Sequence, residues 1–369
     1  MLQSTAMQNR PIGVFEVTLK LQDNPSIDLL VGALREHPDI GDVTLGLKRF
    51  WRGSIEADIA HFHWPEVLFS WKPPNPSQLR RLVRCLQSAR RTTRLIATVH
   101  NRFPHYRDSE ISRQLYAAVY SHMDGIIHRG RSSLDEWTST YPQTADVPHA
   151  IIPAGMPVNF PNTVSRQAAR QHFRLDNSGG VYLSFGDMRH IEEGEQVLDG
   201  FRLMKRRDAR LMVICRSDKK TRAQRFRRHW FRARAAIDSR VRFRVGRVPA
   251  EQVQYYVNSA DVLVISRIHV LNSANLQLGF TFGKVVVGPD TGVVGEMLRE
   301  TGNPVYAPGN PKSLAAALER AYALSQDGHG ELNRTFARQH WNWPQIAQQH
   351  VDFFNQVLER GPAHALTGQ

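Results

Sequence analysis

The segment ADVLVISRIHVLNSANLQLGFTFGKVVVGPDTGVVGE, from Ala260 to Glu296, carries the pattern that predicts the fold of this chain. It begins with a buried strand, continues through a polar loop into an amphipathic helix, and ends with a second buried strand and a glycine-containing loop. Two apolar strands joined by a helix predict a parallel β-α-β unit, because parallel strands need a long crossover connection.

The same alternation of apolar runs and helical patterns extends over most of the chain. The strands predicted in the first half are Ile12–Val17, Val43–Leu47, Ile59–Phe62, Leu95–Val99 and Gly125–His128, with helices at Ser26–Glu36, Ser77–Ala89 and Ile111–His122. The strands predicted in the second half are Val181–Phe185, Leu211–Cys215, Val241–Val245, Val262–Ser266 and Val285–Gly288. Each half therefore predicts an α/β domain built on a doubly wound parallel sheet.

Two domains are expected, because 369 residues exceed the usual span of one hydrophobic core. The predicted boundary lies between Pro153 and Ser165, where PAGMPVNFPN holds three prolines in ten residues. We predict domains at 1–155 and 165–342, and a terminal amphipathic helix at 343–360 that packs back on the first domain. A hinge between the domains makes the cleft between them the expected ligand site.

Charge and cysteine content limit the setting in which the chain works. Lys and Arg outnumber Asp and Glu by 48 to 34, so the protein is expected to attract phosphates of nucleotides, nucleic acids or lipid headgroups. Cys85 and Cys215 both lie in apolar periodic stretches, which predicts neither a disulfide framework nor a metal cluster. The sequence shows no signal peptide and no apolar run of ~20 residues. We expect a cytoplasmic protein, peripheral on the inner face of the cell membrane.

Polar residues at the predicted strand ends of the second half are candidates for binding a phosphorylated ligand, because ligands of parallel sheets bind beyond the carboxyl ends of the strands. Gly186 could let a diphosphate approach the backbone and Arg189 could pair with it; a tight turn with a solvated arginine is the alternative. Arg267 ends the next such strand. The following helix start carries Asn272, Ser273 and Asn275, of which helix capping would explain only one.

The order of these features resembles the C-terminal domain of GT-B glycosyltransferases, especially family four and related bacterial exopolysaccharide enzymes. The matching residues are Asp261–Ser266, Gly283–Val287, Gly292 and Glu296, against a family pattern "aDvvvlPS", "GkPVVa", a glycine loop and a glutamate. The stretches VRFRVGRVPAEQVQYYVNSAD, AIIPAGMPVN and HWNWPQIAQQHVDFF resemble further family segments, so the resemblance covers most of the chain. It implies two Rossmann-like domains that face each other across a cleft.

The sequence departs from the family pattern in two places. Retaining family-four enzymes carry two glutamates whose positions here correspond to Val270 and Leu278. The lysine of their diphosphate loop is replaced within Glu192-Glu193-Gly194. Whether the chemistry is retaining or inverting, and which groups bind the phosphates, therefore stay open.

Candidate catalytic residues gather at two strand ends of the first half. DIAHFHWPE delivers His61, His63, Trp64 and Glu66, and LIATVHN delivers His100 and Asn101. Among them His63, Glu66 and His100 could remove the proton of an acceptor hydroxyl, orient the acceptor, or serve as hydrogen-bonded core groups. DNPSIDLLVGAL and HFHWPE resemble xanthan-type mannosyltransferases, and the candidate acceptor ligands are Asn24, Ser26, Trp64 and Asn101.

Two arginine-rich stretches suggest a further partner. KKTRAQRFRRHWFRARAAIDSR, from Lys219 to Arg240, includes Trp230 and Phe231, and could lie on an anionic membrane surface or be a solvated helix. The second cluster consists of Arg80, Arg81, Arg84, Arg90, Arg91 and Arg94.

The resemblance implies a glycosyltransferase that moves a sugar from a nucleotide-sugar donor to a lipid-linked glycan in exopolysaccharide or glycoconjugate synthesis. GDP-mannose is the preferred donor, ahead of UDP-sugars, because of the xanthan-type resemblance. Arg189, Arg267 and Lys284 would neutralise the leaving diphosphate, while Asn272 to Asn275 and Glu296 would hold donor hydroxyls. We expect no metal and no cofactor besides the donor substrate. The alternatives are a non-catalytic GT-B partner subunit and, less favoured because no binding motif accompanies the charge, a nucleic-acid-binding protein.

Overall fold

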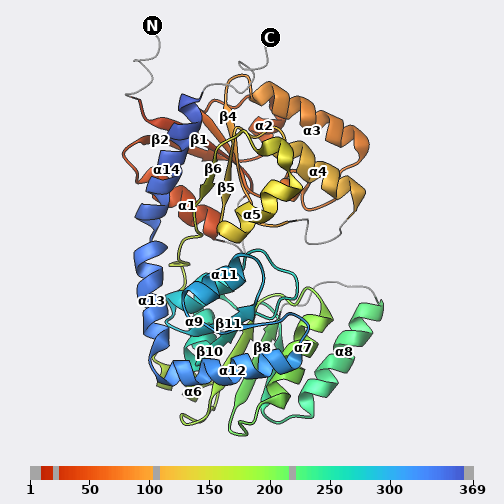
Figure 1. The fold of residues 1–369 in the computed structure, drawn as a ribbon, viewed down its shortest axis with the longest axis vertical. Helices are drawn as coiled ribbons and strands as arrows, with labels where there is room; N and C mark the ends of the chain where they lie inside the picture. The colour runs from red at the N-terminus through yellow and green to blue at the C-terminus, as the bar shows by residue number, and fades with distance from the viewer. Residues whose placement is uncertain (1–9, 20–24, 103–108, 216–221, 361–369) are drawn as a thin grey trace. The chain divides into compact units, whose positions relative to one another are not determined.

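The computed structural model describes residues 10–19, 25–102, 109–215 and 222–360. The chain divides into two compact units, which are described separately: unit 1 comprises Met1–Gly155 with Trp341–Gln369, and unit 2 comprises Met156–His340. Each unit is a six-stranded sheet flanked by helices (Figure 1). The α/β class predicted from the alternation of strands and helices is therefore confirmed.

Unit 1 is built on a parallel sheet with the strand order β2-β1-β3-β4-β5-β6. Its strands are β1 (Ile12–Val17), β2 (Ile40–Leu45), β3 (Ile59–Phe62), β4 (Arg94–Thr98), β5 (Gly125–His128) and β6 (His149–Ile151). Its helices include α1 (Ser26–Arg35), α2 (Lys48–Arg52), η1 (Pro65–Phe69), α3 (Pro76–Ala89), α4 (Glu110–Tyr120), α5 (Arg131–Thr140), η2 (Pro142–Thr144) and α14 (Trp343–Glu359). The strand order reverses between β1 and β3, the place where such sheets bind ligands.

The last helix of the chain completes the core of unit 1. In α14, Ile346, Val351 and Phe354 are buried in the same apolar cluster as residues of α1 and of the central strands. The helix starts at a cap in which the Asn342 side chain accepts a hydrogen bond from the Gln345 backbone N–H at 3.0 Å. The apolar residues of the terminal helix recur at helical spacing because they form the face that α14 buries against unit 1.

Unit 2 is built on a second parallel sheet with the order β12-β11-β10-β7-β8-β9. Its strands are β7 (Val181–Phe185), β8 (Arg210–Cys215), β9 (Val241–Val245), β10 (Val262–Val264), β11 (Val285–Pro289) and β12 (Val305–Tyr306). Its helices are α6 (Arg166–His172), α7 (Ile191–Leu203), α8 (Arg222–Ala236), α9 (Ala250–Ser259), α10 (Ala274–Thr281), α11 (Gly292–Glu300), α12 (Pro311–Gln326) and α13 (His329–His340). The order reverses between β7 and β10, as in dinucleotide-binding sheets.

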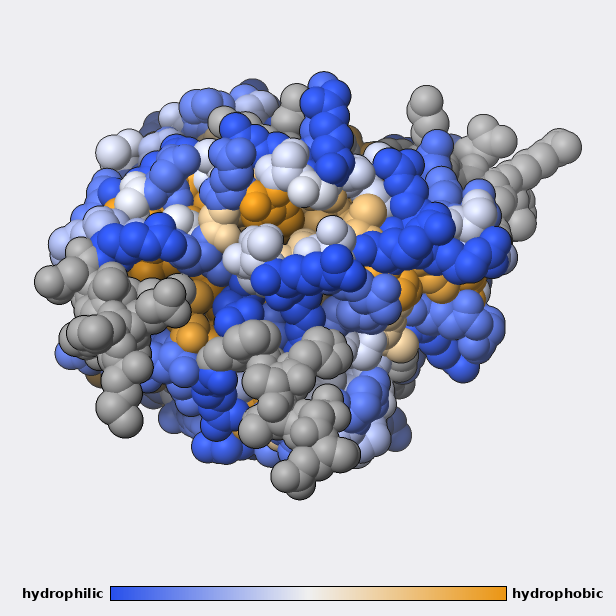
Figure 2. Space-filling model, turned by 90° about the horizontal axis from the view of Figure 1, so that it is seen from above, coloured by the Kyte–Doolittle hydropathy of each residue, from blue (hydrophilic) through white to orange (hydrophobic). Residues whose placement is uncertain are grey.

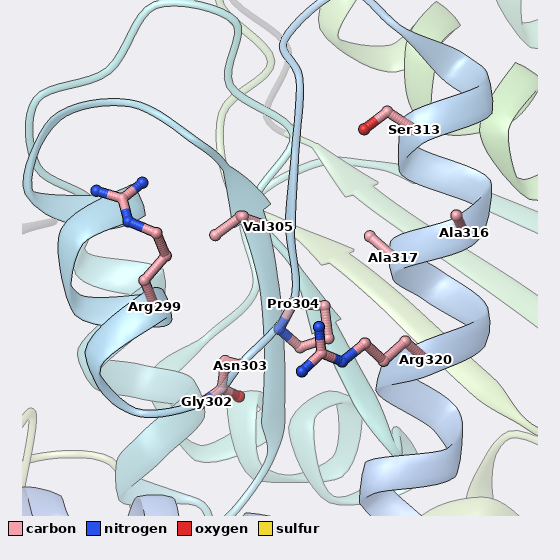
Figure 3. A pocket seen from close by; sticks show the side chains of 9 residues that line it. All are labelled: Arg299, Gly302, Asn303, Pro304, Val305, Ser313, Ala316, Ala317 and Arg320. Carbon is pink, nitrogen blue, oxygen red and sulfur yellow. The ribbon is translucent and has the colours of Figure 1, made fainter.

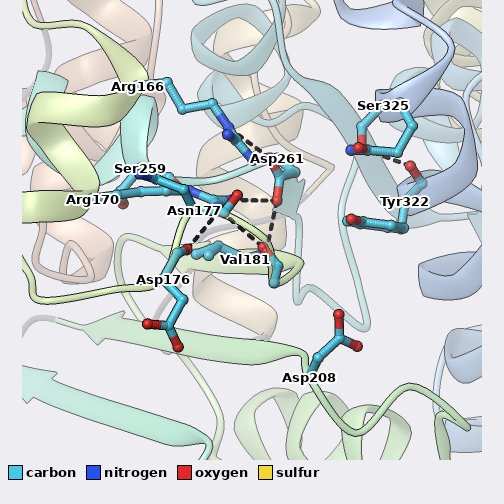
Figure 4. Close-up of polar contacts among 12 residues, drawn as sticks. Arg166, Arg170, Asp176, Asn177, Val181, Asp208, Ser259, Asp261, Tyr322 and Ser325 are labelled. Carbon is cyan, nitrogen blue, oxygen red and sulfur yellow. Dashed lines mark hydrogen bonds and ion pairs between the residues drawn. The ribbon is translucent and has the colours of Figure 1, made fainter.

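A buried ion-pair network fastens the amino edge of the unit 2 sheet (Figure 4). Asp261, directly before β10, accepts hydrogen bonds from the Arg170 guanidinium at 2.6 Å and from the Val181 backbone N–H at 2.8 Å. Arg166 binds the other carboxylate oxygen at 2.9 Å. Because Arg170 is fully buried, loss of Asp261 would leave an unpaired buried charge and cost about 3–5 kcal/mol of stability. Asp261 therefore joins β7, β10 and α6.

Candidate functional site

The topological switch point of unit 2 brings Gly186 and Arg267 beyond the ends of neighbouring strands. Gly186 directly follows β7 and has a φ of +104°, in the region that favours glycine. Its N–H donates to the Ile214 carbonyl at 3.0 Å, which continues the sheet by one residue. Arg267 follows β10 by three residues, and β7 and β10 are hydrogen-bonded neighbours. Two of the predicted donor ligands thus lie at the same edge of one sheet.

Glu193 organises this edge. Its buried carboxylate accepts a hydrogen bond from Arg267 at 2.8 Å and one from the Arg189 backbone N–H at 2.8 Å through the same oxygen. The Arg267 side chain and the Arg189 backbone, which belong to two of the predicted diphosphate ligands, are therefore held by one group at the start of α7. A charge-assisted bond of this kind orients the arginine before any ligand arrives.

The start of α10 contributes the predicted amides and hydroxyl. Ser273 is the residue before the helix and makes no side-chain capping hydrogen bond, while the Asn275 amide donates to the Phe185 carbonyl at 2.5 Å. Asn275 therefore ties α10 to the end of β7, which is a structural use of that amide. Asn272 and Ser273 are half-buried at the same edge.

A close glycine turn holds the neighbouring loop against this edge. Gly292 has a φ of +57°, and a Cβ there would lie 2.7 Å from the Val270 carbonyl oxygen and 2.9 Å from the Leu271 Cα. Only glycine permits this contact between the start of α11 and the chain beyond β10. Glu296, in the second turn of α11, is half-buried.

The structure does not bring Lys284 to these residues. Lys284 directly precedes β11 and so lies at the amino edge of the sheet, with its Nζ 3.5 Å from the Asn258 carbonyl oxygen. Burial lowers the pKa of its amine to about 8, against the opposing effect of Asp261. The prediction of Lys284 as a diphosphate ligand is therefore not supported by its position.

The positions of the two missing family glutamates are apolar in the structure as well. Val270 and Leu278 are both buried. Residues that the sequence did not single out connect the edge instead: the Gln196 amide donates to the Ser266 carbonyl at 2.7 Å and accepts from the Gly309 N–H at 3.0 Å. Gln196 follows Glu193 by three residues on α7. Residues at this spacing lie on the same helix face, so the sequence could have indicated that Gln196 faces the same edge as Glu193.

A pocket of about 380 Å³ lies elsewhere in unit 2, at the amino edge of β12 (Figure 3). It is lined by Arg299, Gly302, Asn303, Pro304, Val305, Ser313, Ala316, Ala317 and Arg320. Arg320 extends from α12 toward Pro304 in the close-up. Because ligands of doubly wound sheets bind beyond the carboxyl ends of strands, we do not assign this pocket to the donor.

In unit 1, a chain of hydrogen bonds runs through the carboxyl ends of β1, β3 and β4. The His100 Nε2 lies 3.2 Å from the His63 Nδ1, and the His63 Nε2 lies 2.7 Å from a carboxylate oxygen of Glu16. The other Glu16 oxygen lies 3.2 Å from His61, whose Nε2 lies 2.8 Å from the Thr98 hydroxyl. We call the sequence His100–His63–Glu16 the relay. His100 is its half-buried end, whereas the other two groups are buried.

The relay holds a carboxylate, Glu16, beside a neutral imidazole, His63, at neutral pH. Burial alone would raise the pKa of Glu16, but its interactions with His61 and His63 outweigh burial and hold that pKa below its usual value. Burial and the proximity of His61 together lower the pKa of His63 to about 4, against the opposing effect of Glu16. A neutral His63 donates one N–H to Glu16 and accepts at its other nitrogen, so it can fix the orientation and basicity of His100.

Glu16, His61 and His63 also place ligand-type atoms within 4.8 Å of one another, the geometry of a possible metal site. Each imidazole is already paired with the carboxylate, and the guanidinium of the half-buried Arg129 interacts with Glu16 and His63. A cation beside these charges would replace satisfied hydrogen bonds and be repelled by the arginine. The donor set therefore fits a carboxylate–histidine network better than a metal centre.

The structure brings some of the predicted catalytic and acceptor residues of unit 1 together and leaves others apart. It brings His63, His100 and Trp64 together: the Trp64 ring stacks on His100 with centroids 4.2 Å apart. His63 is too buried to touch a ligand and acts only through His100. Glu66 lies in η1, outside the relay. Asn101, just beyond β4, and Ser26, the first residue of α1, are both half-buried. Asn24 lies outside the described residues.

Sequence reasoning missed Glu16 and Arg129, which complete the electrostatics of the relay. The signal for Glu16 was a lone carboxylate inside the apolar strand IGVFEV. A buried charge in such a strand needs a partner, and β3, whose His61 pairs in register with Glu16, supplies it.

Comparison with known proteins gives similar folds but no close relative. No family model and no curated protein matches the sequence. HepE of Anabaena, solved in complex with UDP, superposes with a TM-score of 0.70 at 14% identity, over 93% of this chain and 99% of that chain. Sucrose-phosphate synthase of Thermosynechococcus elongatus gives 0.64 at 16% identity, over 88% and 82%. A glycosyltransferase of Rickettsia africae gives 0.68 at 10% identity, over 96% and 100%.

The chain has the GT-B fold. The two parallel sheets of the described residues match glycosyltransferases along nearly the whole chain, as the sequence resemblance implied. At these identities the likeness establishes the GT-B architecture alone, so the xanthan-type family, the donor and the acceptor are matters for proposal. The residues of the two edges must carry that argument.

Proposed function

We propose that this GT-B protein is a glycosyltransferase that takes its sugar from a nucleotide-sugar donor bound by unit 2. The observation that carries the proposal is the reversal of strand order between β7 and β10 together with Gly186, Arg189 and Arg267 beyond those strands. This is where such sheets bind nucleotides, and the two arginines supply the charge that a diphosphate needs.

The donor is proposed to be GDP- or UDP-linked. GDP-mannose remains the preferred donor because of the xanthan-type sequence resemblance, while HepE, solved with UDP-glucose, makes a UDP-sugar the direct competitor. The proposed contacts of Arg189 and Arg267 are to the diphosphate, which both donors share, so these contacts fit either donor.

In the proposed reaction, His100 takes the proton of an acceptor hydroxyl as its oxygen attacks the anomeric carbon. The bond from that carbon to the diphosphate oxygen breaks, and Arg189 and Arg267 stabilise the charge on the leaving nucleoside diphosphate. Glu16 and His63 hold His100 in position and stabilise the imidazolium that forms. We favour inversion, because buried Val270 and Leu278 replace the glutamates of the retaining family.

The roles of the remaining unit 2 residues follow from their positions. Asn272, Ser273 and Glu296 are proposed to hold donor hydroxyls, and Asn275 to position α10 through its bond to β7. The proposed contacts use no metal and no further cofactor. A non-catalytic GT-B partner subunit is the second candidate, favoured by the same loss of the two family glutamates.

Turnover distinguishes these candidates. The purified protein is incubated with GDP- and UDP-sugars, alone and with lipid-linked glycan acceptors, and release of nucleoside diphosphate is measured. An active transferase releases one nucleotide from its donor in proportion to enzyme. A partner subunit releases none from any donor while the protein remains folded.

A membrane surface is proposed as the second partner, with α8 as the contact. Trp230 lies on this helix and Ile237 directly follows its last residue; they are 62% and 83% exposed, although both side chains are large and apolar. The helix holds no acidic residue in its first turn, and Arg227 and Arg232 are exposed on it, Arg227 being paired with Glu192 at 2.7 Å. Exposed aromatic and aliphatic groups among arginines are typical of helices that lie on anionic lipid.

Charged and apolar residues are also exposed outside α8. In the view of Figure 2, hydrophilic residues predominate and apolar residues form small patches, grey atoms aside. In the second arginine cluster, Arg90 is bound to Asp124 at 2.8 Å, while Arg80, Arg81, Arg84 and Arg91 are exposed. No helix in the described part of the chain is both long enough and apolar enough to cross a bilayer.

Vesicle sedimentation tests the membrane proposal. We expect the protein to sediment with vesicles of phosphatidylcholine and phosphatidylglycerol but not with phosphatidylcholine alone, and Trp230→Ser with Ile237→Ser to reduce binding about 10-fold. The control is Leu332→Ser, which removes a different exposed apolar side chain, 65% exposed, from α13. Equal binding of the double variant and the control would refute a role for α8.

A further inference from the structure

Three polar side chains of unit 1 meet without satisfying one another. Glu66 lies in η1, Tyr116 in α4 and Asn101 just beyond β4, and η1 packs against α4. In the part of the chain that the structure describes, both carboxyl oxygens of Glu66, the hydroxyl of Tyr116 and the amide nitrogen of Asn101 are buried and lack a hydrogen-bond partner. The Tyr116 hydroxyl interacts with the other two groups, but none of these pairs has hydrogen-bond geometry.

Such a cluster is costly unless something completes it. A buried polar group without a partner costs about 1–3 kcal/mol. Glu66 is 3% exposed and Tyr116 is fully buried, so bulk water cannot compensate them. Asn101 is half-buried, which places the cluster just beneath the surface at the carboxyl edge of the sheet.

The chemistry of the cluster selects an uncharged ligand. Burial raises the pKa of the Glu66 carboxyl, and burial raises the pKa of Tyr116 as well, so both groups favour their neutral forms. The protonated acid and the phenol each donate one hydrogen bond and accept others, and the amide nitrogen donates. A hydroxyl group, which donates once and accepts twice, complements this set. A phosphate would bring a negative charge that no side chain of the cluster balances, and an ammonium group would require Glu66 to ionise against its raised pKa.

We propose that Glu66, Tyr116 and Asn101 form a subsite that binds one hydroxyl of a neutral sugar residue in the acceptor. The inference rests on the proposed function only for the identity of the ligand as the acceptor. It gives Glu66 a binding role in place of the catalytic role predicted from sequence. The protonated Glu66 donates to the sugar oxygen, while Tyr116 accepts the sugar hydroxyl proton or donates to a second lone pair.

Binding of methyl glycosides tests the subsite without any need for turnover. Saturation-transfer NMR of the full chain with methyl mannoside, glucoside and galactoside measures each affinity, and a series of deoxy analogues identifies the hydroxyl that is read. We expect at least one glycoside to bind, one deoxy position to weaken it about 10-fold, and Tyr116→Phe to weaken the parent glycoside by a similar factor. In the Tyr116→Phe variant, the same deoxy analogue should bind almost as well as the parent glycoside, because the hydroxyl that contacts the missing sugar group has already been removed.

Tyr141→Phe is the matched control, because it removes the hydroxyl of another buried tyrosine of unit 1 that lies outside the cluster. It should leave glycoside affinity unchanged. Without ligand, Tyr116→Phe should keep or raise the melting temperature, since it removes an unpaired buried hydroxyl. If a structural water fills the site instead, Tyr116→Phe will lower the melting temperature and leave all glycoside affinities unchanged, which overturns the proposal.

Failure of the subsite is separable from failure of the transferase. Stabilisation by a nucleotide sugar depends on unit 2, so a protein that binds donor but no glycoside, or binds glycosides without regard to Tyr116, refutes this inference alone. Inorganic phosphate should not displace the glycoside. Displacement by phosphate would show an anion site and contradict the neutral-hydroxyl assignment.

Discussion

The two sheets of this protein share one device at their amino edges and differ at their carboxyl edges. In each unit an aspartate directly before a strand accepts the backbone N–H of the neighbouring strand: Asp58 from Gly13 at 2.9 Å, Asp124 from Leu95 at 2.9 Å, and Asp261 from Val181 at 2.8 Å. Arginines then pair with these carboxylates. Charges at this edge fasten strands to one another.

At the carboxyl edges the two units carry opposite chemistry. Unit 1 buries a carboxylate beside the neutral His63 and ends at the half-buried His100, an arrangement suited to accepting a proton. Unit 2 presents Arg189 and Arg267, set by Glu193, an arrangement suited to a diphosphate. The comparison teaches that a charged residue at the amino edge holds strands together, whereas one at the carboxyl edge is available for a ligand. The edge, rather than the sign of the charge, distinguishes the two roles.

Removal of His100 should have the largest effect on catalysis and tests the assignment of unit 1. We expect His100→Asn to lower kcat about 10²–10⁴-fold, because general-base catalysis contributes a factor of that size, with the donor KM unchanged. The basic limb of the pH profile should also change, which a structural role would not cause. His122→Asn, which alters a histidine that bonds the Ala118 carbonyl of α4 and the adjacent Ser121 hydroxyl, is the control. Retention of near wild-type kcat by His100→Asn would remove the relay from the mechanism.

Removal of Arg267 tests the assignment of unit 2 and should have the next largest effect. We expect Arg267→Ala to lower kcat/KM for the donor about 10²–10³-fold, since it removes a preorganised charge from the leaving diphosphate. Lys284→Met removes a cation from the amino edge of the same sheet and should change donor kinetics less than about 2-fold. If Lys284→Met impairs the donor as strongly as Arg267→Ala, the distinction between edges fails.

Acid should weaken unit 1 before unit 2, which is the smallest of the expected effects. In unit 1 the pKa of His63 is lowered to about 4 and those of His128 and His350 to about 3, in each case chiefly by burial. Between pH 6.5 and 4 the unfolded chain therefore binds more protons than the folded unit, so stability falls as pH falls. Glu66 opposes this trend, because its raised pKa favours the protonated folded form at low pH.

Lys284 of unit 2 titrates in another range. Its folded pKa of about 8 lies below its unfolded value, so its unfavourable contribution develops as pH falls from 10.5 to 8 and then stays constant. Hydrogen exchange measured at pH 7.5 and pH 5 should thus show protection lost first in unit 1. The melting temperature should fall by roughly 2–4 °C for each kcal/mol lost, and less in His128→Asn. Equal loss in both units would contradict the assignment.

Much of the fold was predictable because its strands are apolar and its helices amphipathic. The bounds of β1, β3, β5, β7 and β9 match the predicted ranges. The short strands β6 and β12 were not predicted, since three and two residues carry no readable period. Asn24 and part of the predicted basic stretch, at 219–221, lie outside the described residues, so the structure does not bear on them.

The sites were less predictable, because partners come from distant parts of the sequence. Nothing near HFHWPE shows that His63 bonds Glu16, 47 residues earlier. Lys284 was chosen from the resemblance, although a residue directly before a strand lies at the amino edge of a parallel sheet. Glu193 was noted only as a replaced lysine, and its bond to Arg267, 74 residues later, follows from the pairing of β7 with β10.

The central claim is that the carboxyl edge of unit 2 binds a nucleotide sugar, and the melting temperature of the protein with GDP, UDP and their sugars tests it most directly. A ligand that binds only the folded protein at 100 times its Kd stabilises it by about 2.7 kcal/mol. The account predicts a selective rise with one nucleotide in the wild type and in Lys284→Met, and none in Arg267→Ala. No rise with any nucleotide, or an equal rise in Arg267→Ala, would contradict it.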